Sequence, residues 1–142
     1  MGASAWRYYV PYQEDINQAL QDLRASVFKS GQYYKPQPTA PPAPPPATIE
    51  DLLEANAESG SHSILDVPMV SPQPDLGAVA PLTPDELRQY FGTERPTRET
   101  LERNFPAVYD ITSQRGAWAG TYLVVYADDQ PAEIFFFGQS GD

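Results

Sequence analysis

The chain of 142 residues contains no cysteine and a single histidine, His62. Without cysteine it can form neither a disulfide framework nor a thiolate metal or redox site, and one histidine excludes zinc sites built on histidine pairs. The sequence also contains no glycine-rich phosphate loop and no nucleophile elbow. Because these absences remove most common enzyme constellations, we expect no catalytic residue, no cofactor and no bound metal.

Basic side chains are scarce. Nine Lys and Arg stand against nineteen Asp and Glu, which gives a formal net charge of −10. Residues 1–47 carry four basic and three acidic side chains, whereas the other 95 carry five and sixteen. Such a surface repels phosphate backbones, so we expect no nucleic-acid binding. It attracts basic proteins, although acidity also serves solubility alone.

Long apolar runs are missing too. The longest, residues 122–127, is far short of the roughly 20 residues that cross a bilayer. The N-terminus has neither the basic start nor the apolar stretch of a secretory signal. We therefore expect a cytoplasmic protein without membrane contact, and the lack of cysteine fits a reducing compartment.

What is present favours one folded domain over residues 1–142. Hydrophobic residues make up 41% and aromatics 12%, which is too apolar for intrinsic disorder. Residues 35–47 read KPQPTAPPAPPPA and predict a proline-rich surface loop of polyproline II character. A stiff spacer and a ligand for a proline-recognising module are the two explanations for this loop.

The first third predicts a strand followed by a helix. Residues 6–10 have the aromatic and β-branched content of a strand that Pro11 ends. An amphipathic helix of about four turns should then end near Ser30, before Gly31. Its apolar stripe recurs at helical spacing: Ile16, Leu20, Leu23 and Val27.

The remaining elements are predicted from helix-capping residues and from the alternation of apolar and polar residues. A short helix should begin after Thr48 and close at residues 59–60. Thr83, followed by Pro84 and by Glu86, predicts a capped helix over residues 84–91. The other expected elements are strands at 61–67 and 78–79, a helix from 97 that stops before Pro106, and a hairpin of 118–126 with 133–137.

The fold class that these elements predict is α+β. We expect an antiparallel sheet of four or five strands that ends in the C-terminal β-hairpin and packs against a long N-terminal helix, with short helices around it. The hairpin is nearly continuously apolar, which indicates cover on both faces, by helices on one side and by loops or a partner on the other. Because the edge of the hairpin is expected to be exposed, the protein could be either a monomer or a dimer.

His62 is the candidate acid or base, with Ser61, Ser63 and Asp66 near it in sequence. On a strand, His62 and Asp66 would lie about 13 Å apart at ~3.3 Å per residue, so they meet only if the chain bends. The competing explanation is a hydrogen-bonded structural histidine. One hypothesis for function is a small-molecule or nucleotide pocket, or a weak hydrolase, formed by Tyr12, Arg24, His62 and Asp66.

Aromatic residues gather in the least acidic part of the chain. Tyrosine and tryptophan are enriched in binding hot spots, but alternate members of such a cluster also pack cores. The residues that we predict for binding are Trp6, Tyr8, Tyr12, Arg24, Tyr33, Tyr34, His62, Asp66 and Trp118.

Four segments carry a resemblance: the opening MGASAWRYYVPYQEDINQALQDLRASVFKSGQYY, then GSHSILDV, FGTERPT and the closing EIFFFGQSGD. Together they resemble a group of small acidic bacterial proteins, frequent in actinobacteria, that have no assigned function. The resemblance implies a compact domain framed by its two ends, and no catalytic residue. By analogy, size and acidity are similar to those of immunity proteins and antitoxins, so our main hypothesis is stoichiometric binding of a basic, toxin-like protein.

Overall fold

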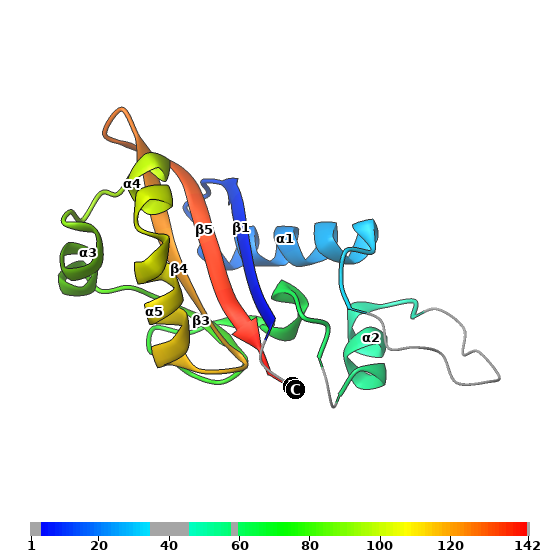
Figure 1. Ribbon diagram of the computed structural model, residues 1–142. Coiled ribbons are helices and arrows are strands. Elements are labelled where there is room, and N and C mark those ends of the chain that lie inside the picture. Colours follow the sequence, from blue (N-terminus) through cyan, green and yellow to red (C-terminus); the bar gives the residue numbers. More distant parts are fainter. Residues whose placement is uncertain (1–3, 35–45, 58–59, 142) are drawn as a thin grey trace.

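A computed structural model describes residues 4–34, 46–57 and 60–141. Five strands form one sheet in the order β1-β5-β4-β3-β2 (Figure 1). The strands are β1 (Ser4–Pro11), β2 (Met69–Val70), β3 (Ala78–Pro81), β4 (Ala119–Ala127) and β5 (Gln130–Ser140). Most of the proline-rich segment, residues 35–45, lies outside the described residues. The α+β class is therefore confirmed.

The prediction of an antiparallel sheet is wrong, because the sheet is mixed. β5 pairs antiparallel with β1 and with β4, which includes the expected C-terminal hairpin, whereas β3 is parallel to both β4 and β2. Between β3 and β4 the chain passes through three helices. A helical crossover returns the chain to the same end of the sheet and so produces a parallel pair.

The N-terminal helix α1 (Ile16–Ser30) has the bounds that its apolar stripe predicts. The Asp15 side chain accepts a hydrogen bond from the Gln18 N–H, and Gly31 closes the helix in the left-handed conformation with φ 73°. At 15 residues, α1 is of ordinary length, so the expectation of a long helix is corrected.

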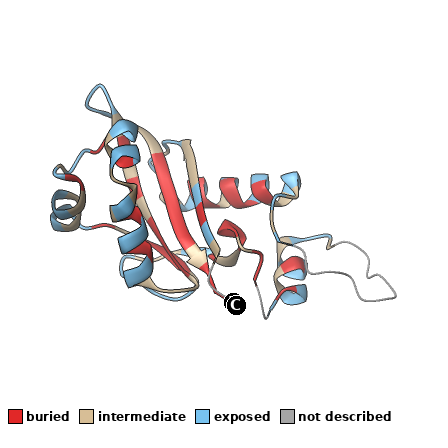
Figure 2. Ribbon diagram, viewed as in Figure 1, coloured by how far each residue is buried: buried red, intermediate tan, exposed pale blue. Residues whose placement is uncertain are grey.

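Helices of this chain cover both faces of the sheet (Figure 1). Helix α1 packs on one face, and α3 (Pro84–Phe91), α4 (Arg98–Arg103) and α5 (Phe105–Arg115) pack on the other. Successive residues of β5 alternate between the two cores: Ile134 and Phe136 face α1, while Phe135 and Phe137 face the other three helices. All four are fully buried, as Figure 2 shows for the centre of the sheet. The expectation that loops or a partner cover one face is therefore corrected.

The sequence pattern does not predict helix α5, because Pro106 favours an end of the helix before it. Instead α4 ends at Asn104, and Pro106 lies in the first turn of α5. Proline is tolerated there because the first turn has no intrahelical acceptor for its missing N–H.

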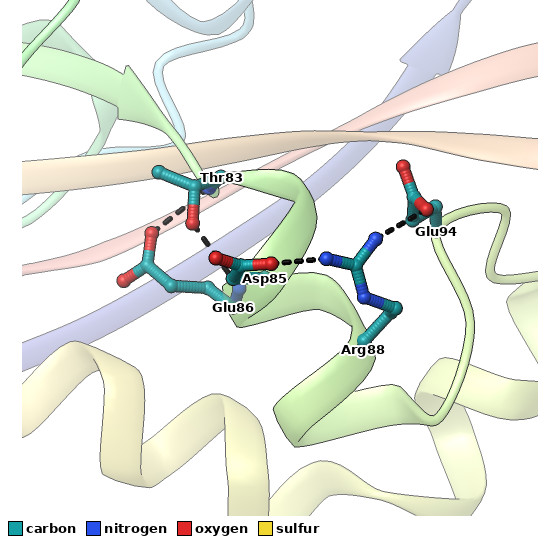
Figure 3. Close-up of polar contacts among 5 residues, drawn as sticks. All are labelled: Thr83, Asp85, Glu86, Arg88 and Glu94. Atoms are coloured by element: carbon teal, nitrogen blue, oxygen red, sulfur yellow. Dashed lines mark hydrogen bonds and ion pairs between the residues drawn. The ribbon is translucent and has the colours of Figure 1, made fainter.

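Helix α3 begins and ends at the residues that its capping signals predict. The Thr83 side chain accepts from the Glu86 N–H, and the Glu86 carboxylate accepts from the Thr83 N–H, a reciprocal capping box (Figure 3). One turn later Arg88 bridges the carboxylates of Asp85 and Glu94 on the surface. The helix ends at Gly92, as predicted.

The strand predicted at residues 61–67 is wrong. The chain forms a short 3-10 helix there, η1 (Ile64–Asp66), whose first turn is capped by the Ser63 hydroxyl. A strand with one buried face would bury every second side chain. Here the neighbouring residues Ile64 and Leu65 are both buried, as is Val67, so the alternating pattern did not indicate a strand. The preceding helix, α2 (Ile49–Ala55), ends at Asn56 and not at residues 59–60.

No helix within residues 4–34, 46–57 and 60–141 combines the length and apolar character that a membrane span requires.

Candidate functional site

Most of the polar residues singled out in the sequence meet at one end of the sheet, where Ser4 of β1 lies opposite Ser140 of β5. Residues 60–67 run past this end. Asp66 lies at its centre: Oδ1 accepts from the backbone N–H of Ser61 at 2.8 Å and from its hydroxyl at 2.9 Å, and Oδ2 accepts from the Ser140 hydroxyl. The Ser61 and Ser63 hydroxyls lie 2.7 Å apart. Oδ1 thus holds the loop together internally, and Oδ2 joins the loop to the sheet.

Trp118 packs against the same loop. A Cβ atom on Gly60 would lie 2.5 Å from the Trp118 ring and 2.9 Å from Asp66 Oδ2, and one on Gly141 would lie 2.9 Å from the indole nitrogen. Only glycine therefore fits at these two positions, and Gly60 also has a left-handed φ of 73°. The half-buried indole of Trp118 closes the end of the sheet.

His62 is held in an unusual conformation, with φ 54°. Its Nδ1 lies 3.1 Å from the Ser4 hydroxyl, and its ring stacks on Tyr34 with centroids 4.4 Å apart and planes 11° apart. Nε2 is buried and has no hydrogen-bond partner among the described residues. His62 makes no hydrogen bond to Asp66 there either, so the side chains do not form a nucleophile–histidine–acid relay.

Arg24 reaches the loop from α1, where it is buried beside the apolar stripe. It donates to the Leu65 carbonyl at 3.0 Å and to the Gln21 side chain at 3.1 Å. Burial lowers the pKa of the guanidinium, and the nearby carboxylates of Glu50 and Asp66 act in the opposite direction. Arg24 is thus part of the packing around the loop.

Tyr12 does not belong to this group. It follows Pro11 at the far end of β1, where its N–H donates to the Ala132 carbonyl. The structure therefore brings together three residues of the predicted pocket, Arg24, His62 and Asp66, and leaves Tyr12 a strand's length away.

The predicted aromatic binding residues have different environments. Trp6 is only 5% exposed, and its ring fills the space above Gly120 and Gly138, so its expected role as a surface anchor is corrected. Tyr8 and Tyr33 are half-buried at the edge of the α1 core. Tyr34 remains 40% exposed on top of the His62 ring.

Helix α2, which carries three acidic residues, is hydrogen-bonded at its C-terminal end to Tyr34. The Asn56 side chain at the end of α2 donates to the Tyr34 carbonyl at 3.0 Å, which fixes the helix beside the stacked rings. Glu50, Asp51 and Glu54 are exposed, and they form no ion pair within the part of the chain that the structure describes. We call Tyr34, His62 and these three carboxylates the α2 surface.

The other end of the molecule differs in its electrostatics. Four arginines on the α3–α4 side are paired with carboxylates: Arg88 with Asp85 and Glu94, Arg95 with Asp129, Arg98 with Glu133 and Arg103 with Glu99. Their charges cancel locally. The α2 surface instead combines an exposed aromatic ring with a helix that exposes three carboxylates, of which Glu50 interacts electrostatically with Arg24.

Sequence reasoning missed Ser4, Gly60 and Ser140 as parts of this end of the sheet. Ser140 lies 74 residues from Asp66, and Ser4 lies 58 residues from His62. Hydrogen bonds at such separations leave no local pattern, so only the pairing of β1 with β5 could have indicated them.

No protein-family model, curated protein or solved structure matches this chain. The resemblance to a bacterial protein group therefore remains a prediction, and the function must be argued from the surface itself.

Proposed function

We propose that this protein binds a basic partner protein in a stoichiometric complex and neutralises it, in the manner of an immunity protein or antitoxin acting on a toxin. The observation that carries the proposal is the α2 surface, where the exposed Tyr34 ring lies on His62 and the attached helix α2 exposes three carboxylates that form no ion pair among the described residues.

The α2 surface has the parts of a protein-binding hot spot. Tyrosine offers a large contact area with few rotatable bonds, and hot spots are enriched in it. Stacking on His62 with centroids 4.4 Å apart restrains the ring before any partner arrives, which reduces the ordering cost of binding. Glu50, Asp51 and Glu54 can then pair with lysine or arginine of the partner.

The charge of the whole chain supports the same partner chemistry. A net charge of −10 attracts a basic protein over a distance and raises its association rate at low ionic strength. The pocket hypothesis has less support, because the oxygens of Asp66 and the terminal nitrogens of Arg24 are already hydrogen-bonded within the fold.

The test is affinity capture from the cell of origin with the full chain, followed by titration of the captured partner. We compare the wild type with Tyr34→Ala and with a double variant, Glu50→Lys and Asp51→Lys. The matched control carries Glu102→Lys and Asp110→Lys, which makes the same change in net charge on the α4–α5 side (Figure 1).

Each variant of the α2 surface should weaken binding at least about tenfold, the effect of a hot-spot substitution. The control should lower only the association rate, and high salt should weaken every complex. The partner's activity should fall linearly to an end point at one equivalent. Equal binding by both double variants, or a partner that stays active when saturated, would contradict the proposal.

A further inference from the structure

Strand β1 forms one edge of the sheet, and its outer side faces away from the other strands. In the order β1-β5-β4-β3-β2 the edge strands are β1, with eight residues, and β2, with two. Among the described residues, no backbone hydrogen bond joins the outer side of β1 to another segment. Ala5, Arg7 and Pro11 are exposed, so the edge is accessible.

The register identifies which backbone groups are open. The Tyr12 N–H donates to the Ala132 carbonyl, which continues the β1–β5 register by one residue. In an antiparallel pair the hydrogen-bonded positions alternate. Ser4, Trp6, Tyr8 and Val10 therefore bond to β5, and the N–H and C=O of Ala5, Arg7 and Tyr9 point outward. Pro11 offers only a carbonyl, which ends the edge.

Arg7 combines this open backbone with an unpaired cation. Its guanidinium carbon lies 4.8 Å from the ring centroid of Phe105 and 5.3 Å from that of Tyr109, on the α5 side of the sheet. It has no carboxylate or carbonyl partner among the described residues, in contrast to the four paired arginines of the α3–α4 side. Tyr109 is itself 52% exposed. The aromatic rings orient the guanidinium and leave its N–H groups free for an anion.

We propose that the edge of β1 takes up an extended segment of another protein that carries an aspartate or glutamate opposite Arg7. The added strand would pair with the open groups of Ala5, Arg7 and Tyr9, and its acidic side chain would lie on the same face as the Arg7 guanidinium. This mode of recognition obtains affinity from main-chain hydrogen bonds and specificity from the side chains of one face.

A second copy of this chain fits the edge poorly. Residues 4–11 read SAWRYYVP and contain no carboxylate, so β1 cannot supply the anion that Arg7 lacks. Two chains of charge −10 also repel each other. The proposal does not depend on the proposed function, because it uses the backbone of β1 and the cation of Arg7, not the carboxylates of the α2 surface.

The probes are two synthetic peptides of alternating valine and threonine that differ only at the central residue, glutamate in one and lysine in the other. Binding to the full chain is followed by amide chemical shifts and by hydrogen exchange. The glutamate peptide should bind about three- to tenfold tighter than the lysine peptide, the effect of exchanging an opposite for a like charge across a strand pair. The amides of Ala5, Arg7 and Tyr9 should exchange more slowly in the complex.

Three variants separate the contribution of the Arg7 charge from that of the outward backbone N–H groups of β1. Arg7→Glu should reverse the preference between the two peptides, whereas Lys29→Glu, the same charge change at an exposed position of α1, should leave it unchanged. Ala5→Pro removes one outward N–H while keeping the bonds between β1 and β5, so it should weaken both peptides. Equal affinity for the two peptides, shifts located away from residues 4–11, or a dimer of the free protein that Ala5→Pro dissociates would overturn the proposal.

Discussion

Asp66 accepts a hydrogen bond from the hydroxyl of Ser140, a residue 74 positions further along the chain. The same carboxylate also accepts from the backbone and the hydroxyl of Ser61. One side chain thus fastens the loop of residues 60–67 to the last residue of β5.

Replacing Asp66 with alanine should therefore destabilise the fold. The change leaves the Ser61 N–H and the Ser140 hydroxyl without an acceptor, which costs about 1–3 kcal/mol for buried groups. Urea unfolding followed by circular dichroism measures the loss. Asp110→Ala, at an exposed position of α5, is the control and should stay within about 0.5 kcal/mol of the wild type. Equal stabilities of the two variants would show that Asp66 does not fasten the loop.

Gly120 lies beneath the ring of Trp6. A Cβ atom there would be 2.7 Å from a methyl carbon of Val79 and 2.9 Å from the Trp6 ring, so Gly120→Ala should cost about 1–3 kcal/mol through overpacking. Trp6→Phe shortens the ring and should relieve part of the strain. A double-mutant cycle should then show a cost below the sum of the two single changes. Strict additivity would contradict this contact.

The two kinds of polar contact in Figure 3 should differ in their contribution to stability. Thr83→Ala removes half of the capping box of α3 and should cost about 1 kcal/mol. Arg88→Ala removes an arginine whose ion pairs are exposed, and should change the free energy of unfolding less than Thr83→Ala does. Thermal unfolding of the wild type and both variants at low and high salt tests this order. Salt should reduce the difference between the wild type and Arg88→Ala and leave the difference between the wild type and Thr83→Ala unchanged.

Burial raises the pKa of the Tyr122 hydroxyl above the ordinary tyrosine value, which is about 10. The unfolded chain therefore loses this proton first as the pH rises. The contribution of Tyr122 to stability is fully present below pH ~10 and is lost as the pH rises through the pKa of the folded state. Tyr122→Phe should accordingly lose less stability than the wild type in urea titrations as the pH rises above about 10. Parallel curves for the two proteins would contradict the raised pKa.

Local sequence determined the elements whose signals lie within a few residues of one another. Helix α1 has its stripe, its Asp15 cap and its terminal Gly31 in one segment, and Thr83 begins α3 as expected. The aromatic and β-branched runs likewise located β1 and the hairpin of β4 with β5. These predictions succeeded because caps, stripes and turns act through contacts between near neighbours.

The candidate site was only partly predictable. His62, Asp66 and Tyr34 were named from their chemistry, but the pattern around them predicted a strand where the chain forms η1. Tyr12 was grouped with them because it is polar and aromatic, although the eight residues of β1 separate it from their end of the sheet. Residue type indicated candidates, and strand pairing decided which of them meet.

The sequence by itself determined the charge, the absence of cysteine, the main helices and the apolar strands. Only the tertiary structure decided that β3 runs parallel to β4, that helices cover both faces of β5, and that β1 lies at the edge with Arg7 against the rings of Phe105 and Tyr109. The reason is physical: the order of strands depends on which apolar faces can be buried together across the whole chain, and that competition leaves no mark within a short segment.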